Sequence, residues 1–88
     1  MKYMVIETFL AGPLPVYQRF REKGRMAPEG LTYVDSWVTT DGMQCFQVME
    51  CADASLLDEW MAAWKDLVSF ETIPVITSAD AAREFGER

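Results

Sequence analysis

Four segments of the chain are rich in the β-branched and aromatic residues that are typical of β-strands. They are residues 3–9 (YMVIETF), 31–40 (LTYVDSWVTT), 43–50 (MQCFQVME) and 70–77 (FETIPVIT). The second and third are joined by Asp41-Gly42, a pair that favours a tight hairpin. Because Pro74 cannot donate a ladder hydrogen bond, we expect the last strand at an edge of a sheet.

Two longer segments space their apolar residues as amphipathic helices do. The first follows Pro13 and Pro15, begins at Val16 and is ended by Gly24. The second begins near Ser55, and its apolar face is predicted to extend through Leu56, Leu57, Trp60, Met61, Ala63, Trp64, Leu67 and Val68. A short acidic helix is expected at about residues 78–85.

The resulting order, β-α-β-β-α-β, is the split βαβ or ferredoxin-like arrangement of the α+β class. With right-handed crossovers, the first and third strands are central in a four-stranded antiparallel sheet. Both long helices then cover one face of that sheet, and the short C-terminal helix is an addition. Since the sequence contains no linker or repeat, we expect a single domain over residues 1–88.

Strand alternation divides the sheet residues into two sets, and two helices can cover only one of them. The aliphatic set is expected to face the helices, and it consists of Met4, Ile6, Val34, Val38, Phe46, Val48, Ile73 and Val75. The other set mixes aromatic and polar residues, and it consists of Tyr3, Val5, Glu7, Phe9, Tyr33, Asp35, Trp37, Cys45, Gln47, Met49 and Thr72. Because this mixed set is too polar for a dry core and too aromatic for water, we expect it to meet a second copy of the chain.

Composition narrows the classes of function. An 88-residue chain has a marginally stable core, and its two cysteines allow one disulfide at most, so a partner subunit is the expected support. The absence of histidine excludes His-ligated zinc or haem and any Ser-His or Cys-His catalytic unit, and no metal or cofactor is predicted. A net charge of −6 argues against nucleic-acid binding. No apolar run approaches the ~20 residues of a membrane span, so we expect a soluble, cytoplasmic protein with reduced thiols.

The mixed face supplies the candidate site residues. Glu7 and Asp35, if partly dehydrated, have raised pKa values and can act as general bases; alternatively, they are interfacial acids held by hydrogen bonds. The predicted ligand-binding residues are Tyr3, Tyr33, Trp37, Cys45, Gln47 and Met49. Their aromatic members can stack on a flat ligand or merely pack together across the sheet. The basic stretch from Arg19 to Arg25 is interpreted as a solvated helix face, and Trp60 and Trp64 as core anchors.

Several segments together resemble a bacterial family of short proteins with a domain of unknown function. They are YMVIE, REKGRM, EGLTYVDSWV, CFQVME, DEWMAAWKDLV and TIPVITS, which extend over nearly the whole chain. That family is similar to the dimeric α/β-barrel superfamily, so the resemblance implies a homodimer whose two sheets form a barrel-like unit. The superfamily includes cofactor-independent monooxygenases, haem-degrading monooxygenases, lactone isomerases and stress-induced binding proteins, and the resemblance implies no particular activity.

Three functions remain open from the sequence. The first is a homodimer that binds a small apolar or aromatic molecule between its sheets. The second is a cofactor-independent monooxygenase or isomerase at the same site, with Glu7 or Asp35 as base. The third is a structural or interaction module in which the mixed face is only the subunit contact.

Overall fold

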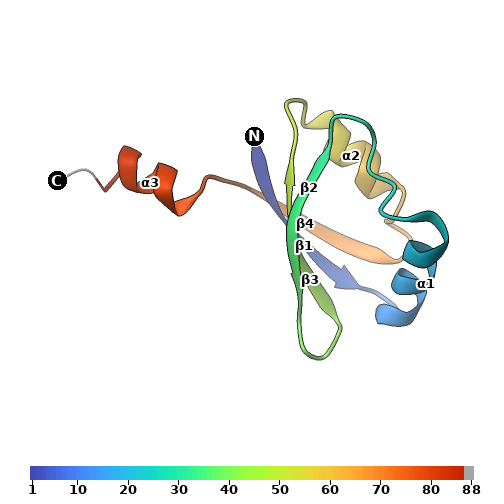
Figure 1. The fold of residues 1–88 in the computed structure, drawn as a ribbon. Coiled ribbons are helices and arrows are strands. Elements are labelled where there is room, and N and C mark those ends of the chain that lie inside the picture. Colours follow the sequence, from blue (N-terminus) through green and yellow to red (C-terminus); the bar gives the residue numbers. More distant parts are fainter. Residues whose placement is uncertain (87–88) are drawn as a thin grey trace.

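The order and pairing of the strands confirm the ferredoxin-like prediction. The computed structural model describes residues 1–86, so the last two residues of the predicted 1–88 domain lie outside the described residues. The elements are β1 (Lys2–Phe9), α1 (Pro13–Lys23), β2 (Thr32–Val38), β3 (Gln44–Glu50), α2 (Ser55–Ala62), β4 (Val68–Val75) and α3 (Ser78–Glu84). The sheet order is β2-β3-β1-β4, with every neighbouring pair antiparallel (Figure 1). Strands β1 and β3 are therefore central, and Pro74 lies on the edge strand β4 as expected.

Helix α2 is shorter than the sequence predicted. It ends at Ala62, and β4 begins at Val68, which pairs with Phe9 of β1. Between them the amides of Ala63, Trp64 and Leu67 bond to carbonyls three residues back, which is the tighter 3₁₀ pattern. These turns keep Trp64 buried while they redirect the chain into the sheet. The apolar residues continue without a break from α2 into β4, so the sequence pattern did not indicate where the helix ends.

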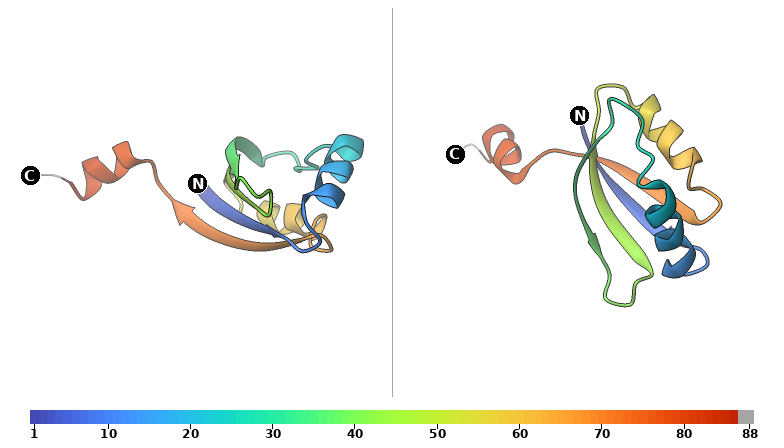
Figure 2. Two further views of the ribbon diagram at one scale, coloured as in Figure 1. Left: turned by 90° about the horizontal axis from the view of Figure 1, so that it is seen from below. Right: turned by 45° about the vertical axis from the view of Figure 1, so that its right-hand side comes forward.

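In β1, β3 and β4, the face of the sheet that meets the helices is the opposite of the one predicted. The core consists of Val5, Phe9, Cys45, Met49 and Val68 from the strands, together with Val16, Leu31, Cys51, Leu57, Trp60 and Trp64. The aliphatic residues of β1 and β3 point to the other side, which α1 and α2 leave uncovered (Figure 2). The prediction was wrong because it took aliphatic character as the mark of the core. The helix side instead has large aromatic side chains and room for buried polar groups.

A β-bulge in β2 also breaks the alternation on which the prediction depended. Tyr33 stands opposite Met49, but Asp35 stands opposite the next residue of β3, Val48. Residues that face each other across an antiparallel pair share one side of the sheet. Tyr33 therefore lies on the helix face, whereas Asp35 and Trp37 lie on the uncovered face.

The uncovered side, which we call the open sheet face, has an apolar centre and a polar rim. Its apolar residues are Met4, Ile6, Trp37, Phe46, Val48, Ile73 and Val75. Its polar residues lie toward the strand ends and edges, and they are Lys2, Thr8, Thr32, Asp35, Gln44, Glu50, Ser69 and Glu71. Trp37 is 57% exposed and Ile73 is 41% exposed, so apolar surface on this face is in contact with water in the single chain.

The segment after β4 leads away from the rest of the fold. Figures 1 and 2 show α3 at the end of this segment, to one side of the sheet and far from α1 and α2. None of its residues is buried. The radius of gyration is 14.4 Å, whereas a compact domain of this length has about 12 Å. The C-terminal arm, residues 76–86, therefore has no core of its own to pack against.

Candidate functional site

A pocket of about 190 Å³ lies between the sheet and α1. It is lined by Glu7, Phe9, Val16, Tyr17, Phe20, Arg25, Ser36, Val38, Cys45, Gln47, Trp60 and Trp64. Seven of these twelve side chains are buried, and they form its floor. Tyr17, Phe20 and Val38 are each about 40% exposed, so they mark its mouth. Eight of the twelve lining residues are apolar, five of these are aromatic, and four are polar.

Three polar residues of the pocket form one chain of hydrogen bonds. The Arg25 Nε donates to the Gln47 Oε1 at 2.8 Å, and the Gln47 Nε2 donates to the Glu7 Oε2 at 2.5 Å. Glu7 and Gln47 are 7% and 4% exposed, and they are the buried polar residues among residues 1–86. A buried acid needs such partners because an unpaired charge in a dry site is costly. Gln47 thus connects the acid to the arginine across the pocket floor.

Burial changes the proton affinity of the groups along this floor. It raises the pKa of Glu7 to about 7, although the hydrogen bond from Gln47 and the charge of Arg25 both act to lower it. Burial, together with the nearby Glu7, also raises the pKa of Cys45 to about 12. Cys45 is therefore a thiol at neutral pH and a poor nucleophile. Glu7 can release or accept a proton near neutral pH, which is the property a general base requires.

Arg25 is held in place through both its side chain and its backbone carbonyl. Its guanidinium carbon lies 3.7 Å from the centre of the Tyr33 ring and 5.3 Å from that of Phe20. Its backbone carbonyl accepts the indole N–H groups of both Trp60 and Trp64, at 3.0 and 2.9 Å. The two tryptophans are thus core anchors, as predicted, and they also fix the segment that carries Arg25. The prediction that Arg25 lies on a solvated helix face was wrong, since α1 ends before it.

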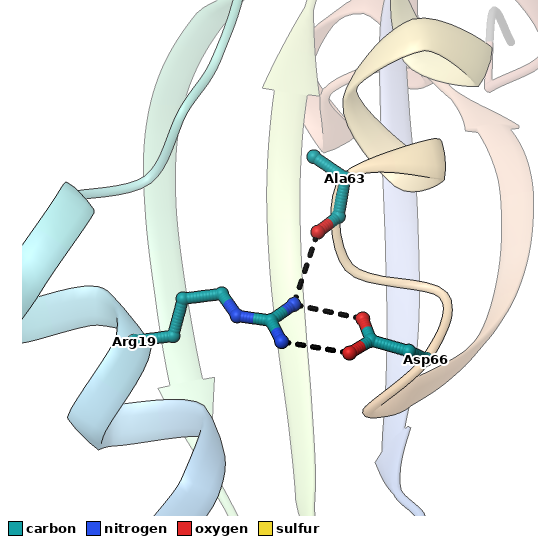
Figure 3. A network of polar contacts seen from close by, with 3 residues as sticks. All are labelled: Arg19, Ala63 and Asp66. Atoms are coloured by element: carbon teal, nitrogen blue, oxygen red, sulfur yellow. Dashed lines mark hydrogen bonds and ion pairs between the residues drawn. The ribbon is translucent and has the colours of Figure 1, made fainter.

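Arg19 ties α1 to the turn that follows α2. Its guanidinium pairs with Asp66 through two hydrogen bonds of 2.7 Å, and it also donates to the carbonyl of Ala63 at 3.1 Å (Figure 3). The fork geometry of arginine suits such a bidentate pair. This contact joins the two elements that flank the pocket. Arg19 therefore lies at the surface, as the prediction of a solvated face implied, but its guanidinium is bonded to another element. Arg21 and Lys23 are exposed as predicted.

The residues predicted for the site are divided between the two faces. Glu7, Cys45 and Gln47 line the pocket together, and Tyr33 stacks on Arg25 beside it. Tyr3 and Met49 pack in or against the core. Asp35 and Trp37 lie on the open sheet face, so Asp35 does not join Glu7 in one site. Residues on the helix face cannot line a space between two open sheet faces, so Glu7, Cys45 and Gln47 do not belong to the predicted cavity between the sheets.

Sequence reasoning missed Arg25 and the aromatic walls of the pocket. The spacing of Trp60 and Trp64 indicated one helix face, but an indole also carries an N–H that needs an acceptor when buried. Two indole N–H groups on one buried helix face indicate that another element supplies a hydrogen-bond acceptor, and that acceptor is the Arg25 carbonyl. Gly24 and Pro28 also showed that the helix ends near Arg25 and leaves this residue in a loop.

The structure gives no sign of a metal centre or a membrane span in its described part. Within residues 1–86, no cluster of three or more Cys, Asp or Glu side chains is arranged to hold a metal ion. Over the same residues, no helix is both long and apolar enough to cross a lipid bilayer. Cys45 and Cys51 are both buried free thiols.

Comparison with known proteins gives a family. A family model described as a domain of unknown function (DUF3303) matches residues 1–87. No curated protein and no solved structure matches the chain.

Proposed function

The chain belongs to the DUF3303 family, and from its own geometry we propose that it binds a small aromatic or apolar molecule in the pocket between the sheet and α1. The observation that supports this most is a mainly apolar pocket, rich in aromatic residues, in which Glu7, Gln47 and Arg25 converge. Apolar walls with a few fixed polar groups are typical of small-molecule sites.

The volume of the pocket limits the size of the ligand. An engineered protein cavity of ~150 Å³ holds benzene, so a pocket of about 190 Å³ fits a compound with one ring and a short substituent. Drug-sized sites begin at roughly 300 Å³. A fused polycyclic ligand would therefore require Tyr17 and Phe20 to move apart at the mouth.

Filling the pocket tests this proposal. Val16 lines it from α1, so Val16→Phe should occupy the space and weaken binding of single-ring probes such as phenol, benzoate and acetophenone. Leu14 is on the same helix and is 82% exposed, so Leu14→Phe is the matched control and should bind like the natural protein. Titration by two-dimensional NMR should show shifts for Cys45 and Gln47. If no probe shifts them, or if Val16→Phe binds equally well, the pocket is not the site.

A proton-transfer enzyme at the same site is the second candidate. The raised pKa of Glu7 favours it, because this carboxylate can take a proton from a carbon next to a carbonyl and return it. Of the enzyme classes expected from the sequence, an isomerase depends directly on such a base. In deuterium oxide, we expect the protein to speed exchange of the methyl hydrogens of acetophenone, measured by NMR. Glu7→Gln should abolish this exchange and Glu50→Gln, on the opposite face, should retain it; equal rates in both variants exclude Glu7 as the base.

We also propose that the open sheet face joins two copies of the chain. An apolar centre with a polar rim is the usual anatomy of a protein interface.

The chain exposes 5743 Å², whereas a compact protein of its mass exposes about 5200 Å². The face of a sheet of four strands with seven or eight residues each covers roughly 20 by 25 Å, about 500 Å² per copy. Two copies then bury about 1000 Å², the smallest area at which a biological interface is normally proposed. The projecting C-terminal arm can add to this area by lying on the second copy.

The mass of the protein in solution tests the second-copy proposal. Trp37→Glu places a charge on the open sheet face without touching the core, and it should change a dimer into a monomer in sedimentation equilibrium. Leu14→Glu, on an exposed position of α1, should leave the dimer intact. A natural protein that sediments as one chain at high concentration would refute the interface.

A further inference from the structure

Arg25 brings a positive charge to the pocket, and among residues 1–86 no carboxylate pairs with it directly. Its Nε bonds to Gln47, but among residues 1–86 neither of its two Nη atoms makes a hydrogen bond or an ion pair. The nearby acid, Glu7, is bound by Gln47 and not by Arg25. The guanidinium therefore keeps up to four N–H donors available beside an aromatic pocket.

From this geometry we infer that the pocket selects an anion, namely a single-ring carboxylate whose ring lies among the aromatic walls and whose carboxylate pairs with the Nη atoms of Arg25. The inference rests on the proposed small-molecule function and specifies the class of ligand. A planar guanidinium matches a carboxylate through two parallel hydrogen bonds, which a lysine cannot reproduce. The ring size follows from the pocket of about 190 Å³.

The arginine is preorganised for this task. Tyr33 and Phe20 stack on its guanidinium, and Trp60 and Trp64 fix its backbone carbonyl. Freezing a free arginine side chain normally reduces affinity, because its rotamers are lost on binding. Here that ordering is already present before the ligand enters.

Glu7 makes the binding of an anion depend on pH. A carboxylate ligand repels the Glu7 carboxylate, so binding favours the protonated acid and weakens as the pH rises through about 7. The titratable and charged groups that act on Glu7 are Arg25, Cys45 and Tyr17. The pKa of Cys45 is raised to about 12 and that of Tyr17 is raised above its ordinary value, so neither ionises between pH 6 and pH 8. Within this range Glu7 is therefore the group of this set that changes charge.

The experiment compares two ligands of the same shape. Benzoate and benzamide are titrated into the full chain at pH 6 and followed by two-dimensional NMR. We expect benzoate to bind more tightly, and Arg25→Met to weaken benzoate about 10- to 100-fold while benzamide changes little. Arg21 belongs to the same basic stretch but is exposed, so Arg21→Met should behave as the natural protein. Raising the pH to 8 should weaken benzoate in the natural protein but not in Glu7→Gln.

The outcomes separate the inference from the proposed function. If both ligands bind the natural protein equally, anion selection is refuted while the pocket remains a binding site. If benzoate is preferred but Arg25→Met retains that preference, the assignment to Arg25 is wrong. If neither ligand shifts the pocket residues, the small-molecule function fails, and the inference fails with it. The comparison of ligands on the natural protein does not depend on whether a variant folds.

Discussion

The burial of Glu7 should give the stability of this protein an unusual dependence on pH. Because burial raises its pKa from 4.5 to about 7, the folded protein holds a proton between these values that the unfolded chain has released. Below pH 4.5 Glu7 is protonated in both the folded and the unfolded protein, so burial does not disfavour folding through a charge on this side chain. Between pH 4.5 and about 7 the free energy of unfolding should fall as the pH rises, and above about 7 the whole contribution is lost.

The size of this effect follows from the pKa difference. One pKa step corresponds to about 1.4 kcal/mol, so a rise from 4.5 to about 7 amounts to about 3 kcal/mol. Glu7→Gln removes the charge and keeps the volume, and the new amide oxygen can still accept from the Gln47 Nε2. We therefore expect the variant to match the natural protein near pH 4.5 and to exceed its stability by up to about 3 kcal/mol at pH 8.

Urea unfolding from pH 4.5 to 8.5, followed by circular dichroism, measures this difference. Carboxyls whose pKa is lowered, such as that of Asp41, contribute equally to both proteins and cancel in the comparison. Glu59→Gln is the matched control, since that carboxyl is exposed on α2, and its curve should run parallel to that of the natural protein. Parallel curves for Glu7→Gln and the natural protein would show that Glu7 is not dehydrated in the fold.

Two further predictions concern the backbone and the tryptophan pair. Gly30→Ala should destabilise the protein more than Gly24→Ala, by about 1 kcal/mol in thermal unfolding. Both positions have positive φ, but of the two only Gly30 would place its new Cβ against another side chain, 3.0 Å from the Leu56 Cδ1. Equal losses of stability would refute this reasoning. Trp60→Phe and Trp64→Phe each remove one of the two N–H groups that donate to the Arg25 carbonyl, so each single variant leaves that carbonyl one partner. The double variant leaves it none, so its free energy of unfolding in urea should fall by more than the two single losses together, by about 0.5 kcal/mol or more. Simple additivity would show that the two bonds act independently.

The fold was predictable because its strongest signals are local. The Asp41-Gly42 turn does connect β2 and β3, and Pro74 does lie on an edge strand. Two features that depend on tertiary context were not predictable. The bulge after Tyr33 leaves no mark in the alternation, and the change from α2 to β4 occurs inside one continuous apolar stretch.

The site was half visible in the sequence. Glu7, Cys45 and Gln47 stood out as polar residues in the middle of strands that are mainly apolar there, and they do share one pocket. They were assigned to a subunit contact because a core was assumed to be aliphatic. Nothing in the spacing of the strands indicates that Arg25 lies beside them, since a loop residue reaches the sheet only through the tertiary fold.

The tryptophans of this protein are divided between the two sides of its sheet, and this gives two separate optical reporters. Trp60 and Trp64 are 2% and 5% exposed beside the pocket, whereas Trp37 is 57% exposed on the opposite side. A dissolved collisional quencher such as iodide reaches only the latter, so the part of the emission that it removes reports whether that side is covered. The emission that survives arises from the shielded indoles, and a change in its wavelength reports an aromatic guest.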